Sequence, residues 1–271
     1  MIAEMLSYGF MCRALVVGTL VSLCAALLGV SLVLKRYAMI GDGLSHVGFG
    51  ALSVALAMNL SPLKVSVPVV VLAAFGLLRL SESQRIKGDS AIALISTSSM
   101  AIGVIVTSLS GGMNVDVYGY MFGSILSMNM EDVYLSVGLS AVVLFLFFLF
   151  YHRIFAVTFD ENFARATGIR ADRYNILLAL LTAVTVVLGM RMMGTLLISS
   201  LIIFPALSAM RVFKRFLWVV LCAALISVLC FFAGMTVSFS LSIPTGASVV
   251  IANLTCYLLM SLVGTITLGR G

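Results

Sequence analysis

Charged residues are scarce in this chain: 10% of its 271 residues are Asp, Glu, Lys or Arg, whereas 62% are hydrophobic. An average soluble domain carries roughly 25% charged residues. No soluble fold could bury this much apolar surface, so the composition indicates an all-α polytopic membrane protein. The sequence also lacks a polar or Pro- and Ser-rich stretch long enough to separate two folded units. Residues 1–271 are therefore interpreted as a single transmembrane domain.

Several motifs of enzymes and binding proteins are absent. The sequence has no Gly-x-x-x-x-Gly-Lys-Ser/Thr phosphate loop, so the chain cannot bind ATP in that manner, and no His-Glu-x-x-His or hydrolase triad. The 5 cysteines form no Cys-x-x-Cys pair and are interpreted as small buried hydrophobes. Residues 1–8 contain no basic residue, unlike a signal peptide, so the first span is expected to act as an uncleaved insertion signal.

Long apolar runs are abundant, and runs of about 17–25 residues predict membrane spans. Nine spans are predicted, and the pattern is compatible with eight to ten. Residues 118–130 are too short to cross a membrane and are interpreted as a re-entrant or half-buried helix. The predicted spans are residues 10–34, 44–60, 65–80, 90–109, 133–151, 175–190, 194–212, 216–236 and 245–268.

The 16 basic residues are unevenly distributed among the loops. When the loops after the first, third, fifth and seventh spans are grouped with the C-terminus, only Arg13, Lys64 and Arg191 fall outside the group. Cytoplasmic loops are enriched in Lys and Arg, so we expect the N-terminus outside and the C-terminus in the cytoplasm. The net charge of +6 then reflects membrane orientation and is no sign of nucleic-acid binding.

Asp42 and His46 are the main candidates for a functional site. They are four residues apart, so on a helix they share one face, and a carboxylate with an imidazole forms part of many divalent-metal sites. Gly41 and Gly43 would allow a sharp turn where the second span begins, at its cytoplasmic end by the charge pattern. Alternatively, Asp42 is a helix N-cap and His46 a packing residue bonded to a backbone carbonyl. Two residues cannot complete a coordination sphere, so further ligands must come from elsewhere in the chain, from a second copy or from water.

A second candidate is the segment 159–169, in the longest polar stretch of the chain. Acidic residues at its start, a late arginine and a glycine stop predict a short amphipathic helix whose two phenylalanines share a face. This helix would lie at the headgroups or dock into a groove on a cytoplasmic partner. Its candidate residues are Phe159, Asp160, Glu161, Phe163, Arg165 and Gly168.

The third candidate is the seventh span, which contains Pro205. A proline inside a helix removes a backbone hydrogen bond and is expected to kink the span, although a tolerated transmembrane proline is the simpler interpretation. A kinked helix that contains Ser199 is typical of a pore-lining or moving element, and Ser45 is a further polar candidate for the pathway. Arg191 is expected to mark a tight outer turn before this span.

These segments occur in an order that resembles a known family. The chain is similar to the membrane-spanning permease of bacterial ABC importers for zinc, manganese or iron, which have the type II ABC importer fold. It departs from the family at Gly43, where members often have Ala, but this leaves Asp42 and His46 unchanged. The matching segments are residues 28–36, 41–46, 120–125, 159–169, 194–206 and 244–247.

The resemblance implies a transporter subunit of the bacterial cytoplasmic (inner) membrane, with no permanent cofactor and no enzymatic activity of its own. Its implied partners are two ATP-binding cassette subunits that hydrolyse ATP, an extracytoplasmic metal-binding protein and a second permease, identical or paralogous. Asp42 and His46 of each permease would transiently coordinate the transported ion, and residues 160–169 would bind the ATPases. The chain does not distinguish zinc, manganese and ferrous iron.

Two other transporter classes are alternatives to this interpretation. One is an ABC permease for iron-chelate or cobalamin-type substrates, which would not need an Asp/His pair in its pathway. The other is a stand-alone secondary transporter, for which inverted repeats and paired broken helices are expected. We find neither feature in the sequence.

Overall fold

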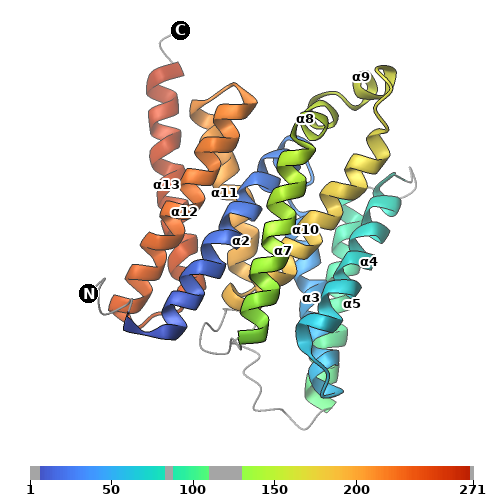
Figure 1. Cartoon of the computed structure of the whole chain (residues 1–271), viewed down its shortest axis with the longest axis vertical. Coiled ribbons are helices and arrows are strands. Elements are labelled where there is room, and N and C mark those ends of the chain that lie inside the picture. Colours follow the sequence, from blue (N-terminus) through green and yellow to red (C-terminus); the bar gives the residue numbers. More distant parts are fainter. Residues whose placement is uncertain (1–6, 83–87, 110–129, 269–271) are drawn as a thin grey trace.

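The computed structural model describes residues 7–82, 88–109 and 130–268, and within these ranges all regular secondary structure is helical (Figure 1). An all-α fold is therefore confirmed for the described chain. The helices are α2 (Gly9–Leu34), α3 (Ile40–Ala57), α4 (Pro62–Glu82), α5 (Gly88–Leu109), α7 (Met130–Leu149), α8 (Tyr151–Phe159), α9 (Glu161–Ala166), α10 (Ala171–Met193), α11 (Thr195–Val212), α12 (Phe216–Leu241) and α13 (Thr245–Leu268).

Each of the nine predicted spans coincides with one of the described helices. In this part of the chain, 8 helices are long and apolar enough to cross a membrane, and α11 contributes a shorter apolar stretch, Leu197–Val212. Two helices extend further at their N-terminal ends than predicted: α3 begins at Ile40 and α10 at Ala171, each four residues before the predicted start. A prediction based on apolar runs alone does not include such polar first turns. The predicted re-entrant segment, 118–130, lies outside the described residues except for Met130, which begins α7.

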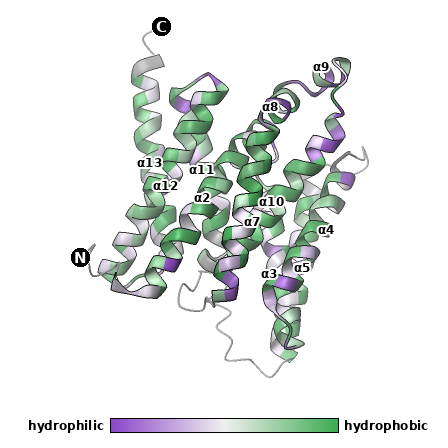
Figure 2. Cartoon of the chain, in the orientation of Figure 1, coloured by the Kyte–Doolittle hydropathy of each residue, from purple (hydrophilic) through white to green (hydrophobic). Residues whose placement is uncertain are grey.

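The helices form an inclined bundle with α2 near its middle (Figure 1). α2 packs against α7, α10, α11 and α12, whereas α3 packs mainly against α4 and α5. Figure 2 shows apolar residues along the helices and polar residues concentrated near their ends. Large apolar side chains are exposed on outer faces, as expected where lipid is the solvent; examples are Leu225 and Leu229 of α12 and Leu258 and Leu262 of α13.

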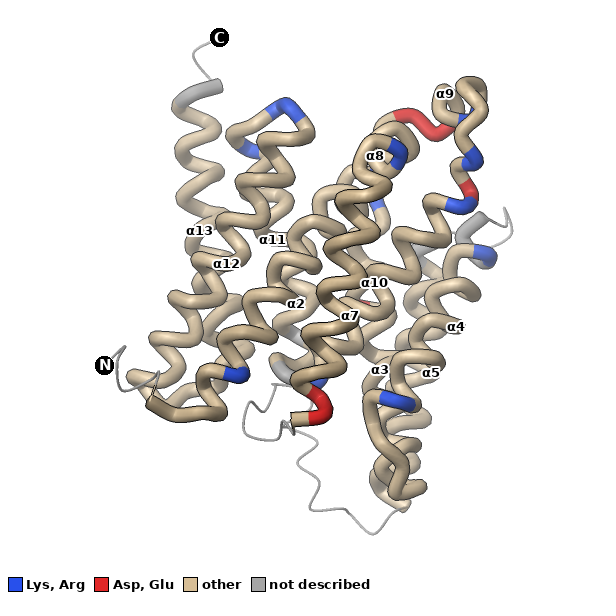
Figure 3. The backbone as a smooth tube through the Cα atoms, in the orientation of Figure 1, with Lys and Arg blue, Asp and Glu red and all other residues tan. Residues whose placement is uncertain are grey.

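Charged residues are segregated between the two ends of the bundle (Figure 3). Most described Lys and Arg residues lie at the end that carries α8 and α9, here called the α9 end. The opposite end, here called the Asp132 end, carries the first turn of α7. There Lys64 pairs with Glu131 over 2.7 Å and Arg191 pairs with Asp132 over 2.5 Å.

A tight turn follows Arg191, as expected from sequence, but Arg191 itself is still helical. It lies in the last turn of α10, where its side chain is 10% exposed and bound to Asp132 of α7. The turn into α11 is made by Gly194, whose φ of 83° favours glycine because it has no Cβ. An arginine next to a short loop was interpreted as a loop residue, but its buried carboxylate partner keeps it inside the bundle.

Candidate functional site

Asp42 and His46 lie on the first two turns of α3, where the backbone is already helical. Met39 occupies the N-cap position, so the interpretation of Asp42 as an N-cap is wrong. Gly41 and Gly43 are also helical and make no sharp turn, because the chain reverses earlier, at Arg36, which has a φ of 62°. A carboxylate in the first turn of a helix interacts favourably with the helix dipole, which offsets part of the cost of its position.

The two side chains face each other. Nε2 of His46 lies 3.7 Å from Oδ2 of Asp42, and the side chains are 24% and 39% exposed respectively. The other carboxylate oxygen, Oδ1, accepts a hydrogen bond from Oγ of Ser199 over 3.1 Å, so α11 contributes to the same site. Asp42, His46 and Ser199 thus form a partly exposed polar cluster between α3 and α11.

This cluster lies within the bundle, away from the α9 end where we expected it. A Cβ built on Gly29, more than one turn before the end of α2, would lie 2.1 Å from the carbonyl oxygen of Ile202. A Cβ built on Gly41 would lie 2.7 Å from Cδ1 of the same Ile202, so α3 begins beside the interior of α2. Further along α3, Gly48 contacts Met190, near the Asp132 end of α10. The turn after α2 therefore brings the chain back into the bundle before α3 begins.

The polar cluster is an incomplete metal site within the described residues of one chain. They contain no group of three or more His, Cys, Asp or Glu side chains that could hold a metal ion. The other histidine, His152, lies on α8 at the α9 end. Structural zinc sites in proteins have four ligands, so Asp42 and His46 could supply half of one. An exposed carboxylate inside a membrane-spanning bundle is also energetically costly unless water or protein covers it.

The remaining pathway candidates differ in what they contact. Oγ of Ser45 is fully buried and donates to the backbone carbonyl of Asp42 over 2.7 Å, so its hydrogen bond is made within α3. Ser199 is the serine that reaches the Asp42 carboxylate. Pro205 lies inside α11, which is helical on both sides of it. Its proposed role in a moving helix stays a prediction.

The segment 159–169 is divided between two helices. Asp160 is extended, with φ −147° and ψ 98°, and its Oδ1 accepts a hydrogen bond from the backbone N–H of Phe163 over 2.9 Å. Asp160 therefore ends α8 and caps α9. The expectation that Phe159 and Phe163 share one helix face is wrong, because Phe159 ends α8 and packs against Phe216. Phe163 is 66% exposed, and Gly168 has a φ of 85° beyond the end of α9.

Glu161, the first residue of α9, is the centre of a polar network. Its Oε1 pairs with Arg165 over 2.8 Å, and its Oε2 lies 3.2 Å from both Nζ of Lys35 and Nδ2 of Asn175. Lys35 also donates to Oδ1 of Asn175. Partial burial raises the pKa of the Glu161 carboxyl, but hydrogen bonds from Arg165, Asn175 and Lys35 outweigh it and hold the pKa below its ordinary value.

Lys35 was missed as a functional candidate. In the sequence, a lysine directly after an apolar span is typical of cytoplasmic loop charge. The signal that separates it from its neighbour Arg36 is burial: the Lys35 side chain is 8% exposed, whereas Arg36 is exposed. Burial depends on where α9 and α10 fold, which local sequence does not show.

Comparisons with known proteins show the family of the chain. Residues 7–264 match the model of a family described as the ABC 3 transport family. The chain is 30% identical over 257 residues to the manganese transport system membrane protein MntC of Halalkalibacterium halodurans, covering 94% of this chain and 88% of that protein. It is also 30% identical over 241 residues to the high-affinity zinc uptake system membrane protein ZnuB of Haemophilus influenzae, covering 89% and 92%.

A solved structure has the same fold. PsaBC from Streptococcus pneumoniae in complex with Fab superposes with a TM-score of 0.85 at 25% sequence identity, covering 96% of this chain and 95% of that one. The likeness thus extends over nearly the whole chain.

Proposed function

Because the chain belongs to the ABC 3 transport family, we propose that it is the membrane-spanning permease of an ATP-driven importer of divalent transition-metal ions. The observation that carries the proposal is the family match over residues 7–264 together with the Asp42/His46 pair inside the bundle. The relatives are named for manganese and zinc, so these two ions are the first candidates, followed by ferrous iron. The named relatives favour free ions over iron chelates or cobalamin, and an ABC family disfavours a stand-alone secondary transporter.

Two copies of the permease would enclose the transport pathway. In one chain, Asp42 and His46 supply two ligand groups and are 39% and 24% exposed at a depth where lipid would disfavour them. A second permease, identical or paralogous, would cover them and supply the other half of a four-ligand site. A transit site must also release its ion, so an incompletely shielded carboxylate and imidazole fit transport better than permanent storage. Zinc, manganese and ferrous iron all accept such oxygen and nitrogen ligands.

The α9 end would face the cytoplasm and the ATPases. It carries most of the described Lys and Arg residues, as expected for the cytoplasmic side (Figure 3). There α9 presents Phe163, which is 66% exposed, beside the charged residues Glu161 and Arg165. An exposed aromatic residue on a short capped helix suits insertion into a groove on a partner. Two ATP-binding cassette subunits would bind α9 and hydrolyse ATP, and the metal-binding protein would dock at the Asp132 end.

Co-purification and reconstitution test this function. The chain, co-expressed with its proposed ATPase and metal-binding protein, is expected to copurify with the ATPase and to support ATP-dependent uptake of manganese or zinc into proteoliposomes. A complex that takes up neither ion, nor ferrous iron, with ATP present would contradict the proposal. Uptake driven by an ion gradient without ATP would identify the secondary transporter instead.

A further inference from the structure

Lys35 is a buried cation at the end of α2. Its side chain is 8% exposed and lies between Glu161 of α9 and Asn175 of α10, whereas the adjacent Arg36 is exposed. Burying a lysine costs hydration energy that an ion pair recovers only in part, so a charge on the positive side of a membrane protein would ordinarily extend into water. The buried position of Lys35 therefore requires a reason beyond membrane orientation.

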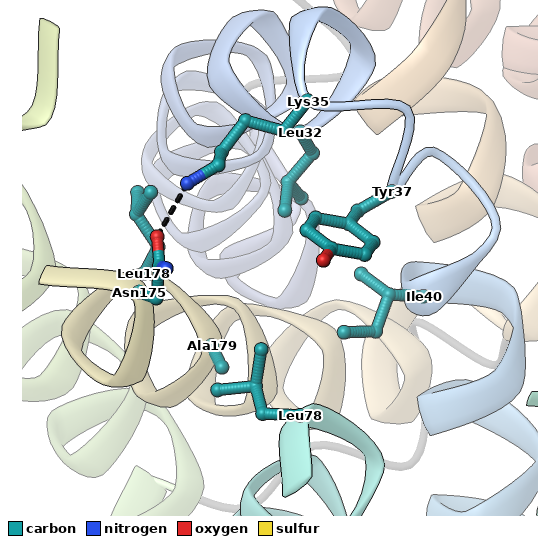
Figure 4. A pocket seen from close by; sticks show the side chains of 8 residues that line it. All are labelled: Leu32, Lys35, Tyr37, Ile40, Leu78, Asn175, Leu178 and Ala179. Carbon is teal, nitrogen blue, oxygen red and sulfur yellow. Dashed lines mark hydrogen bonds between the residues drawn. The ribbon is translucent and has the colours of Figure 1, made fainter. Parts of the chain in front are cut away.

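The ion pair links α9 directly to the end of α2. α9 packs on α8 and α10, and Glu161 of α9 also reaches Lys35 across 3.2 Å. Figure 4 shows Lys35 extending from α2 to Asn175, with Tyr37 and Ile40 following in the next turn around a small apolar cavity. The same cavity is lined by Leu32 of α2 and by residues of α4 and α10. Lys35 is thus held by α9 and α10 at the point where the chain turns toward α3.

The turn from Lys35 to α3 is short and hydrogen-bonded. The backbone N–H of Tyr37 donates to the carbonyl of Leu32 over 2.8 Å, and that of Ile40 donates to the carbonyl of Tyr37 over 3.0 Å. Ile40 is 4% exposed and begins α3, two residues before Asp42. A displacement of Lys35 therefore passes directly to the start of α3, because no flexible linker lies between them.

We propose that Lys35 is a positioning residue that transmits movement of α9 to the Asp42/His46 site through the turn between α2 and α3. The inference rests on the proposed function, in which ATPases bind α9. When they move α9, Glu161 displaces Lys35 and Asn175, and the start of α3 shifts against α11. The contact between Asp42 and Ser199, which spans these two helices, then changes and opens or closes the metal site. These contacts form a continuous route from α9 to the start of α3, along which such coupling can be carried.

The test is the number of manganese ions transported per ATP hydrolysed by the complete transporter in proteoliposomes. The variants are Lys35→Met, Glu161→Gln and the double variant Lys35→Met with Glu161→Gln. Each single variant is expected to lower the ions per ATP at least about fivefold, with the ATPase still bound and hydrolysing ATP. The double variant is expected to lie within about twofold of the lower single variant, because both residues act through the same contact. Arg36→Gln, which changes the adjacent exposed cation, is the matched control and is expected to transport normally.

Two results would overturn the inference. In one, Lys35→Met and Glu161→Gln keep the wild-type ratio of ions to ATP. In the other, the variants lose the ATPase from the complex, so that uptake and hydrolysis fall together and Lys35 serves only to hold α9. Glu161→Gln, on the exposed α9, keeps the test decisive if Lys35→Met does not accumulate. Failure of wild-type uptake would instead contradict the proposed function itself.

Discussion

Oδ1 of Asp42 on α3 accepts a hydrogen bond from Oγ of Ser199 on α11 over 3.1 Å, although 157 positions separate the two residues. The other carboxylate oxygen faces His46, so a single aspartate connects the helix contact with the proposed metal ligands. This relationship makes Ser199 a neighbour of the proposed metal site even though a serine hydroxyl is a weak ligand.

Ser199→Ala tests this neighbour directly. Without its hydroxyl donor, Asp42 is less well oriented toward His46, so we expect KM for manganese to rise about two- to fivefold with kcat nearly unchanged, which corresponds to a loss of about 0.5–1 kcal/mol in binding free energy. The measurement is initial uptake against manganese concentration. Ser200→Ala is the matched control, because Oγ of Ser200 donates to the carbonyl of Leu197 in its own helix. Equal KM values for both variants would contradict the role of Ser199.

The close approach of α2 to α11 predicts that Gly29 tolerates no side chain. A Cβ there would lie 2.1 Å from the backbone oxygen of Ile202, which cannot move without shifting α11. We expect Gly29→Ala to lower the free energy of unfolding by about 1–3 kcal/mol, the usual cost of overpacking. Thermal unfolding in detergent measures it. Gly138→Ala, where nothing lies within 4 Å of the built Cβ, should leave stability unchanged or slightly higher.

The ion pair between Arg191 and Asp132 predicts a strongly asymmetric response to mutation. Both side chains are nearly buried, with 10% and 12% exposure. Asp132→Asn leaves the guanidinium without its counter-charge, so we expect a loss of about 3–5 kcal/mol in unfolding free energy. Replacing both residues, as Asp132→Asn with Arg191→Met, should cost less than the single change. Thermal unfolding in detergent measures the stability of both variants. A double variant less stable than Asp132→Asn would refute this account.

The depressed pKa of Glu161 predicts an acid-sensitive attachment of α9. Because the folded-state pKa lies below the ordinary value of 4.5, the ion pairs stabilise the structure above that pH, and the stabilisation is lost as pH falls through the folded pKa. Limited proteolysis at the loops around α9 should therefore be slower in wild type than in Glu161→Gln at neutral pH. The two rates should converge as the pH falls below 4.5. A difference that stayed constant with pH would show that Glu161 is not the titrating group.

The sequence predicted the spans well because lipid imposes a simple rule: a crossing helix needs a long apolar run. It also predicted that Asp42 and His46 share a helix face, since that spacing is local. Their distance from the α9 end could not be predicted, because the return of the chain into the bundle depends on the close approach of Gly29 and Gly41 to Ile202. The partners of Lys35 and Arg191 were missed for the same reason: each lies on a helix distant in sequence. Whether Asp42 and His46 bind the transported ion stays a prediction.

The most direct test of the account is uptake by the double variant Asp42→Ala with His46→Ala. Proteoliposomes containing the complete transporter would receive labelled manganese, zinc or ferrous iron with ATP, at equal permease levels. The account predicts ATP-dependent uptake of at least one ion by wild type and its loss by about tenfold or more in the double variant, with the ATPase still bound. Unchanged uptake by the double variant would contradict the Asp42/His46 site.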